Sequence, residues 1–424
     1  MKRADKIFPQ IGMTYQILNN RGIHDLKTIA EEYYHQQAMQ QQQGIWGYDR
    51  YLKHGAHSSG TINSLDAELS HECTVWSINH YLGLNRHPYV IRKAKEILDI
   101  YGTGCGTSAM SGGHSQLHKN LQKRFARLMG KEETLLFSTG FTVNSGVIAS
   151  LCRTTKTLIL IDRDCHASII DGCKASGSQF LPFKHNSVVD LETKLKKYSP
   201  KYINILVVTE GAYSMQGDLA CLEEIVSLKN KYNFLLYVDE AHSFGIYGDK
   251  GAGLCRELKI EKEVDFIMTT LSKATASIGG IVATSKEFAS LLRFSTTYLF
   301  QAAIPPVDVA VIDACLDILE KDQTIRQHLL EKADYLREKV VSLGFDVGNS
   351  RSPIIPIYIR DPNILRLMEK ELFINGIFTI AIQHPAVSKT EGRFRFIINN
   401  SHTFEDIDAL VSILQKLGKQ YAII

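Results

Sequence analysis

The sequence predicts an α/β protein with a mostly parallel sheet in a large domain, followed by a smaller α+β domain. From about residue 130, short β-rich runs alternate with stretches of helical periodicity. This alternation is typical of a parallel sheet covered by helices on both faces. The last hundred residues change character, because a long amphipathic stretch leads to three short β-rich runs and a final helix.

The expected elements follow this pattern in chain order. A helix is expected over residues 24–43. Strands of the large sheet are expected at Thr134–Ser138, Leu158–Asp162, Ile205–Glu210, Leu235–Asp239, Phe266–Leu271 and Ile281–Thr284. The small domain is expected to hold a long helix at Val309–Leu343, strands at Ile354–Ile359, Phe378–Ile382 and Phe394–Ile398, and a helix from about Thr403. We therefore divide the chain into an N-terminal helical segment (1–60), a large domain (61–305) and a small C-terminal domain (306–424).

Composition is that of an ordinary globular protein, since 44% of the 424 residues are hydrophobic and 22% are charged. The formal net charge of +3 comes from scattered basic residues, so no nucleic-acid partner is expected. The eight cysteines include no Cys-x-x-Cys pair and are expected to be reduced thiols. We expect a cytoplasmic protein, because the N-terminus lacks an apolar signal core and no stretch approaches the roughly twenty apolar residues of a membrane span.

Three segments with chemically useful residues fall at the carboxyl ends of predicted strands, where open α/β sheets bind ligands. Asp239 ends one strand, and a carboxylate there can hold a protonated pyridine nitrogen, although it could also cap the next helix. Lys273 stands among small residues, as a Schiff-base lysine would, although a surface lysine is the simpler alternative. In Phe137–Asn144 a strand ends in a small-residue turn that opens a helix and can present N–H groups to a phosphate, as many tight turns can.

The order and spacing of these pieces are more specific than any one of them. A glycine turn followed by four pairs of residues has the order expected of fold-type I enzymes, which use pyridoxal 5′-phosphate (PLP). The pairs are Asp162…His166, Glu210…Ser214, Asp239…His242 and Thr270…Lys273. Within that group the chain resembles the α-oxoamine synthases, which condense an amino acid with an acyl thioester and release CO₂. The resemblance covers about residues 70–415 and is carried by Asn79-His-Tyr-Leu-Gly83, Gly113-x4-His118, Asp162…His166-Ala-Ser168, His185-Asn-Ser187, Glu210–Asp218, Asp239–Ser243, Thr270-Leu-Ser-Lys273, Pro305-Pro306 and Arg393-Phe-Arg395.

The resemblance implies roles for the residues around the cofactor ring. Lys273 would bind PLP as a Schiff base and later remove the Cα proton of the amino acid. Asp239 would pair with the pyridinium, and His242 would hydrogen-bond the phenolic oxygen of the ring. His166 would stack on the ring face and polarise the acyl carbonyl, with Ser214 close to the ring.

The resemblance also implies how the phosphate and the substrate are held. Gly140, Phe141 and Thr270 would hold the phosphate. Asn79 and Arg395 would hold the carboxylate of the amino acid. The same resemblance implies a homodimer with the active site at the subunit interface.

Some stretches indicate which α-oxoamine synthase this is. Cys165–Gly172, Phe183–Val188 and Tyr213-Ser-Met are most similar to bacterial serine palmitoyltransferases, enzymes of sphingolipid biosynthesis, whereas Pro385–Lys389 is similar to autoinducer (α-aminoketone) synthases. We therefore predict condensation of a small amino acid with an acyl thioester on coenzyme A or a carrier protein. The alternatives are synthases of 8-amino-7-oxononanoate, 5-aminolevulinate or 2-amino-3-ketobutyrate, an aminotransferase or lyase of the same fold, and a non-catalytic partner subunit.

Three positions depart from the family pattern. Gln383 stands where relatives often have an arginine, which removes one expected carboxylate contact. Gln301 stands where relatives pass a hydroxyl to the phosphate of the neighbouring subunit, and His80 replaces an Asp or Asn. Because of these changes the sequence does not determine which amino acid is the substrate, whereas the prediction of PLP is unaffected. His114 and His118 share the i, i+4 spacing of a helical metal site, but no third ligand is evident and no metal is expected.

Overall fold

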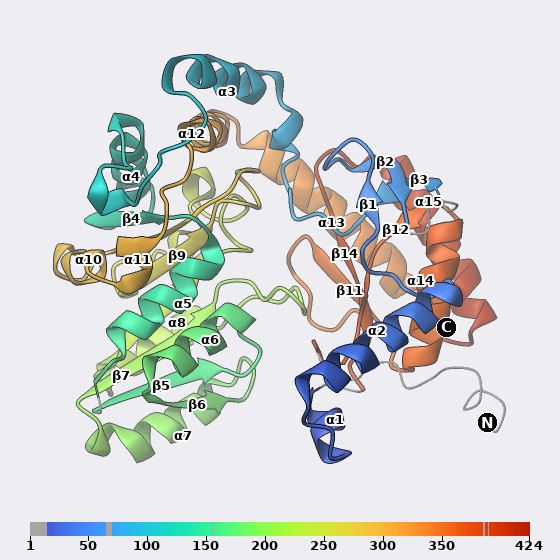
Figure 1. Cartoon of the computed structure of the whole chain (residues 1–424), viewed down its shortest axis with the longest axis horizontal. Coiled ribbons are helices and arrows are strands. Elements are labelled where there is room, and N and C mark those ends of the chain that lie inside the picture. The colour runs from blue at the N-terminus through green and yellow to red at the C-terminus, as the bar shows by residue number, and fades with distance from the viewer. Residues whose placement is uncertain (1–14, 65–69, 155, 385, 389) are drawn as a thin grey trace. The chain divides into compact units, whose positions relative to one another are not determined.

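The structure is a computed structural model that describes residues 15–64, 70–154, 156–384, 386–388 and 390–424 (Figure 1). Its contacts divide the chain into two compact units, one of which is Asn79–Leu330, while the other combines the residues up to Ile78 with Glu331–Ile424. The domain borders at residues 60 and 305 stay a prediction, and the contact units differ from them. One reason is that α12 (Pro306–Lys321) packs on α3 (Pro88–Tyr101) and α4 (Gln116–Leu128).

The Asn79–Leu330 unit is built on a seven-stranded sheet of order β4-β10-β9-β8-β7-β5-β6. Its strands are β4 (Glu133–Phe137), β5 (Thr157–Asp162), β6 (Gln179–Phe183), β7 (Asn204–Glu210), β8 (Leu235–Asp239), β9 (Phe266–Thr270) and β10 (Gly280–Thr284). Strands β5 to β9 are parallel, and β10 is antiparallel to both of its neighbours. The predicted mostly parallel sheet is therefore confirmed.

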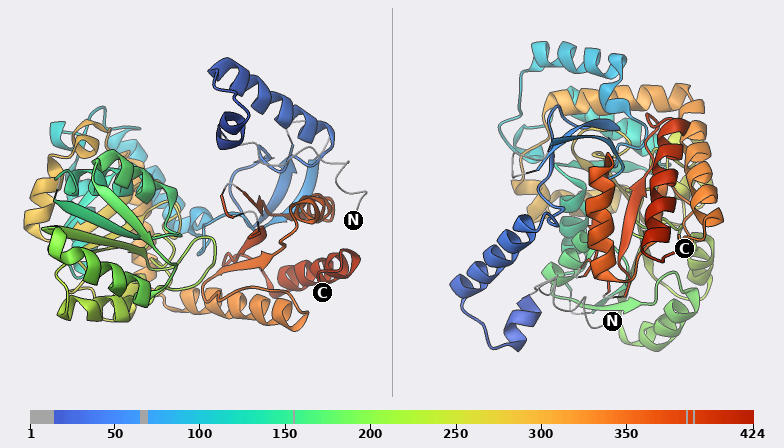
Figure 2. Two further views of the ribbon diagram at one scale, coloured as in Figure 1. Left: turned by 90° about the horizontal axis from the view of Figure 1, so that it is seen from below. Right: turned by 90° about the vertical axis from the view of Figure 1, so that its right-hand side faces the viewer.

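Helices cover both faces of this sheet (Figure 2). Besides α3, α4 and α12, the helices of this unit are α5 (Gly140–Leu151), α6 (Ala167–Ser176), α7 (Val188–Tyr198), α8 (Leu222–Ser227), α9 (Leu254–Glu257), α10 (Lys286–Arg293) and α11 (Thr296–Phe300). Helix α5 packs on α6 and on the strands β9 and β10. Val143 and Val147 of α5 join strand residues such as Ile161 and Phe266 in one buried cluster. Because this cluster fixes α5 and α6 on the sheet, it also fixes the residues at their N-termini.

The other unit contains two small sheets. The first has the order β1-β2-β3-β12 and the second the order β11-β14-β13. Their strands are β1 (Tyr51–Leu52), β2 (Ser59–Asn63), β3 (Ser70–Val75), β11 (Ile354–Tyr358), β12 (Ile377–Phe378), β13 (Ala381–Ile382) and β14 (Arg393–Ile397). The helices are α1 (Tyr15–Asn20), α2 (Leu26–Gln42), α14 (Pro362–Ile374) and α15 (Phe404–Gln420), while α13 (Thr324–Ser342) crosses the border between the units.

Some expected elements differ from the structure. The single helix expected at Val309–Leu343 is two helices, α12 and α13, because Asp322 is extended and its carboxylate accepts hydrogen bonds from Thr324. The strand expected at Phe378–Ile382 is divided between the two small sheets as β12 and β13. Strand β6 was not located from sequence, since it is an edge strand that contains Pro182. None of the helices formed by the described residues has an apolar stretch long enough to cross a bilayer.

Candidate active site

A pocket of about 250 Å³ lies at the carboxyl ends of the parallel strands, wholly within the Asn79–Leu330 unit. Its walls come from the carboxyl ends of β7, β8 and β9 and from the segments that follow β4, β5, β8 and β9, which are far apart in sequence. The lining residues are Thr139, Gly140, Phe141, Asn144, His166, Ser168, Glu210, Asp239, Ala241, His242, Met268, Thr270, Ser272 and Lys273. The structure thus brings together seven of the residues singled out from sequence, at the place where α/β sheets bind ligands.

Lys273 is held in a short line of polar groups in this pocket. Its Nζ lies 2.7 Å from Nε2 of His242, and Nδ1 of the same histidine lies 2.6 Å from the hydroxyl of Tyr81. His242 and Tyr81 are both buried. The lysine amine is therefore positioned by the fold rather than extended into solvent, as the alternative of an ordinary surface lysine would require. In the sequence, Tyr81 is only a member of the motif Asn79–Gly83, from which no role for its side chain is predicted.

Asp239 is buried at the end of β8, and its two carboxylate oxygens have separate donors. Oδ1 accepts from the backbone N–H of Ala241 at 2.9 Å, and Oδ2 accepts from Nδ2 of Asn144 at 2.7 Å. The residues after Asp239 form turns rather than a helix. The simpler alternative, a helix-capping aspartate, is therefore wrong, and a carboxylate held at the pocket wall can pair with a cationic ring nitrogen.

The N-terminus of α5 forms another part of the pocket wall. Thr139 caps this helix, and the first helical residues, Gly140 and Phe141, line the pocket. A Cβ atom on Gly140 would lie 2.6 Å from Cβ of Thr270, so the close approach of α5 to β9 requires glycine here. The unpaired N–H groups and the dipole of a helix N-terminus favour an anion such as a phosphate.

His166 caps α6 and also lines the pocket. Its backbone N–H donates to Oε1 of Glu210 at 2.5 Å, and its Nδ1 lies 2.8 Å from Oγ of Ser168. Burial, together with the nearby carboxylate of Asp239, raises the pKa of Glu210 well above its ordinary value. Neither Glu210 nor Ser168 was given a role from sequence, although both lie in quoted motifs.

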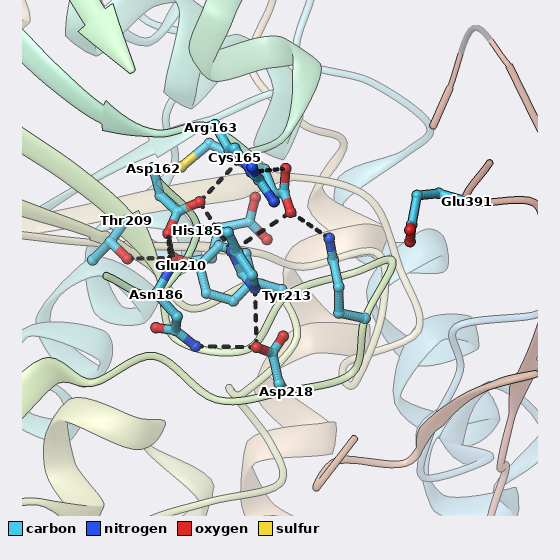
Figure 3. A network of polar contacts seen from close by, with 12 residues as sticks. Asp162, Arg163, Cys165, His185, Asn186, Thr209, Glu210, Tyr213, Asp218 and Glu391 are labelled. Atoms are coloured by element: carbon cyan, nitrogen blue, oxygen red, sulfur yellow. Dashed lines mark hydrogen bonds and ion pairs between the residues drawn. The ribbon is translucent and has the colours of Figure 1, made fainter. Parts of the chain in front are cut away.

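A network of charged and polar side chains around His185 supports the turn that carries His166 (Figure 3). His185 lies between two carboxylates, with Nδ1 3.0 Å from Asp162 and Nε2 3.0 Å from Asp218. Tyr213 donates to the other oxygen of Asp162 at 2.9 Å. Although burial lowers the pKa of His185, its hydrogen bonds to the two aspartates raise it to about 10. His185 is therefore a partly buried cation that fixes the end of β5, four residues before His166.

The remaining predicted residues are less closely defined. Ser214 is buried in the turn after β7 but is not among the described residues that line the pocket. Asn79 and Arg395 belong to different units, so their shared role stays a prediction. Oδ1 of Asn79 is buried and has no hydrogen-bond partner among the described residues. Two ends of the autoinducer-synthase-like stretch, Pro385 and Lys389, lie outside the described residues.

The positions that depart from the family pattern also have defined surroundings. Oε1 of Gln301 accepts from the backbone N–H of Ser138 at 3.4 Å, in the turn before α5. Burial lowers the pKa of His80, and Gln383 is buried in the other unit. His114 stacks on His118 at 4.7 Å between ring centres. The described residues contain no group of three or more His, Cys, Asp or Glu side chains that could hold a metal ion.

Comparison with known proteins identifies the family. A family model described as aminotransferase class I and II matches residues 71–414. The chain belongs to this family. It is 38% identical over 378 residues to a serine palmitoyltransferase of Bacteroides ovatus, and the aligned residues cover 89% of this chain and 94% of the relative. It is 37% identical over 349 residues to an 8-amino-7-oxononanoate synthase of Thermoanaerobacter pseudethanolicus, which covers 82% and 88%.

Solved structures agree with these relatives. A serine palmitoyltransferase from S. paucimobilis with a bound PLP–myriocin aldimine has a TM-score of 0.88 at 27% identity and covers 95% of this chain and 100% of that chain. An 8-amino-7-oxononanoate synthase from Francisella tularensis has a TM-score of 0.72 at 26% identity, with 83% and 99% covered. The predicted fold-type I architecture and the resemblance to α-oxoamine synthases are confirmed. The cofactor is PLP, and the protein is a PLP-dependent acyltransferase.

Proposed function

We propose that this acyltransferase condenses L-serine with a long-chain acyl-CoA and releases CO₂, as a serine palmitoyltransferase does. The observation that carries the proposal is the pocket itself. It is lined by Lys273, Asp239, His242 and His166, the residues for which the resemblance implies roles around the cofactor ring. Serine is the first choice because serine palmitoyltransferases cover 89% of the chain at 38–40% identity. The proposal extends to a cytoplasmic homodimer that serves sphingolipid synthesis.

The residues of the pocket fit PLP at three points. Asp239 offers an anchored carboxylate to the ring nitrogen, the N-terminus of α5 at Gly140 and Phe141 offers N–H groups to the phosphate, and Lys273 offers an amine to the aldehyde. When bound, PLP supplies an electron sink that makes the Cα–H bond of the amino acid acidic. Without Asp239 beside the ring nitrogen, that electron sink would be weak.

Different side chains of the protein then have different roles in the reaction. Lys273, with Nζ next to His242, takes the proton from Cα, and the hydrogen bond between Tyr81 and His242 keeps both groups in place. His166 faces the pocket as a hydrogen-bond donor to the acyl carbonyl, where negative charge develops during attack. Asn79 and Arg395 hold the carboxylate of serine, which is lost as CO₂ after the new C–C bond forms.

A second candidate is 8-amino-7-oxononanoate synthesis, in which alanine would replace serine. It is favoured by relatives of that name at 37–39% identity over about four fifths of the chain. The two functions differ in the amino acid that binds next to the cofactor, so binding separates them.

The test is a titration of the PLP-loaded protein with serine, alanine and glycine, followed by visible absorption. We expect a band that depends on Lys273 and shifts at the lowest concentration with serine. Lys273→Ala should lose this band, whereas Lys196→Ala, which changes an exposed lysine on α7, should keep it. A shift with alanine but not with serine would replace the first proposal by the second. A protein without any Lys273-dependent band would favour the non-catalytic partner subunit.

A further inference from the structure

A line of polar side chains joins Asp239 to His166 along the wall of the pocket. Asn144, on α5, is 1% exposed and lies between them. Its Nδ2 is 2.7 Å from Oδ2 of Asp239 and 2.9 Å from Oγ of Ser168. Ser168, in the first turn of α6, is in turn 2.8 Å from Nδ1 of His166. These contacts connect two residues that face different parts of the cofactor pocket.

The direction of each hydrogen bond in this line can be derived from its ends. The carboxylate of Asp239 can only accept, so it must face the NH₂ group of Asn144 rather than the amide oxygen. The amide oxygen of Asn144 then accepts from the hydroxyl of Tyr237 at 2.7 Å. A flipped amide would place two acceptors against each other in a buried site, which costs free energy. Asn144 therefore donates one N–H to Asp239 and the other to Ser168.

The hydrogen bond between Ser168 and His166 has the same direction, with the Ser168 hydroxyl as the donor. Because its oxygen accepts from Asn144, its proton is available for Nδ1 of His166 at 2.8 Å. The backbone N–H of Ser168 also points at Nδ1, at 3.3 Å. Two donors that converge on one ring nitrogen require it to be unprotonated, and a neutral imidazole then carries its proton on the other nitrogen.

We infer that Asn144 and Ser168 are positioning residues that hold His166 as the neutral tautomer with its proton on Nε2. In this tautomer His166 acts in the pocket as a hydrogen-bond donor and not as a base. Donation suits an oxygen that gains negative charge, such as the acyl carbonyl, and leaves removal of the Cα proton to Lys273. The catalytic consequence rests on the proposed function, whereas the tautomer itself does not.

The inference is tested by nitrogen NMR of the PLP-loaded full-length protein with ¹⁵N-labelled histidine at neutral pH, with His166→Gln to assign the signals. The wild-type protein should show an unprotonated Nδ1 and a protonated Nε2 for His166. Ser168→Ala should reduce the preference for this tautomer by about 5–10-fold, as expected for the loss of one hydrogen bond. Ser176→Ala, at the far end of α6, is the matched control and should leave the His166 signals unchanged.

Kinetics provide a second measurement. Ser168→Ala should lower kcat by about 10-fold while changing the dissociation constant of PLP by less than about 2-fold, because Asn144 still holds Asp239 in this variant. If Ser168→Ala does not fold, Ser168→Cys keeps a weak donor and should move the tautomers in the same direction by a smaller amount.

A proton on Nδ1, or on both nitrogens, in the wild-type protein would overturn the inference, as would an unchanged tautomer in Ser168→Ala. Absence of turnover with serine would count against the proposed function alone, since the NMR measurement does not depend on turnover.

Discussion

The partly buried cation His185 gives the most quantitative prediction. His185 is held by Asp162 and Asp218, and only 15% of its side chain is exposed. Although burial alone would lower the pKa of His185, the two carboxylates raise it from 6.5 to about 10. A histidine whose pKa is higher in the folded than in the unfolded state stabilises the fold fully below its unfolded pKa of about 6.5. That stabilisation declines as the pH rises towards about 10.

The magnitude follows from the same shift. At about 1.4 kcal/mol per pH unit, the raised pKa of His185 corresponds to roughly 5 kcal/mol of net stabilisation near pH 6, and roughly 1 kcal/mol remains near pH 9.5. His185→Gln removes the charge but leaves both aspartates in place, and Asp162 is buried. Removing one partner of a buried ion pair typically costs about 3–5 kcal/mol. We therefore expect His185→Gln to lose about 3 kcal/mol of unfolding free energy at pH 7.

The assay is urea unfolding of the PLP-loaded wild type, His185→Gln and the control His87→Gln at pH 7 and pH 9.5, followed by far-ultraviolet circular dichroism. His87 is exposed in the same unit and should behave as wild type at both pH values. The gap between wild type and His185→Gln should narrow by at least half at pH 9.5. A gap of equal size at both pH values would refute a charged His185.

Three further predictions concern the pocket. Asp239→Asn removes the carboxylate at the ring nitrogen and should lower kcat by about 100-fold or more while the Lys273-dependent absorption band remains; a kcat close to wild type would contradict the role of Asp239. Gly140→Ala places a Cβ atom 2.6 Å from Cβ of Thr270 and should weaken PLP binding by about 10-fold, as measured by cofactor titration; unchanged affinity would argue against a phosphate at the N-terminus of α5. Tyr81→Phe removes the hydrogen bond to His242 and should lower kcat by about 3–10-fold without changing KM for acyl-CoA; a change in KM alone would place Tyr81 in substrate binding instead.

The sequence predicts the large sheet well because its central strands carry a strong local signal. All six residues of β5 are buried, and the run Leu158–Ile161 is continuously apolar, as expected for a parallel strand with helices on both faces. The residues that follow such strands, Asp239 and Lys273 among them, therefore fall at the same edge of the sheet. Their meeting in one pocket follows from topology, which the order of strands and helices already indicates.

Elements whose signal is weak or non-local could not be predicted in the same way. The two-residue strands β12 and β13 are too short for a periodic pattern, and their division between two sheets depends on pairing with β3 and β14. The break between α12 and α13 depends on one aspartate, Asp322, whose side chain competes with the helix.

The supporting residues of the site could not be assigned from sequence because their roles are set by hydrogen bonds between distant segments. Asn144 reaches Asp239 across 95 positions of sequence, and Tyr81 reaches His242 across 161. In the sequence, Asn144 looks like any polar residue of an amphipathic helix. Its role becomes visible once the amide, the carboxylate and the serine hydroxyl are found together in a buried site.

The central claim is that the Lys273 pocket joins serine to an acyl group with loss of CO₂. The most direct measurement is mass spectrometry of the products formed by the PLP-loaded protein from serine and palmitoyl-CoA, with Lys273→Ala as the control. We predict an aminoketone that retains the serine side chain and lacks its carboxylate, one free coenzyme A for each product, and no product from Lys273→Ala. Formation of pyridoxamine phosphate and a keto acid in place of the aminoketone would contradict the account and indicate an aminotransferase.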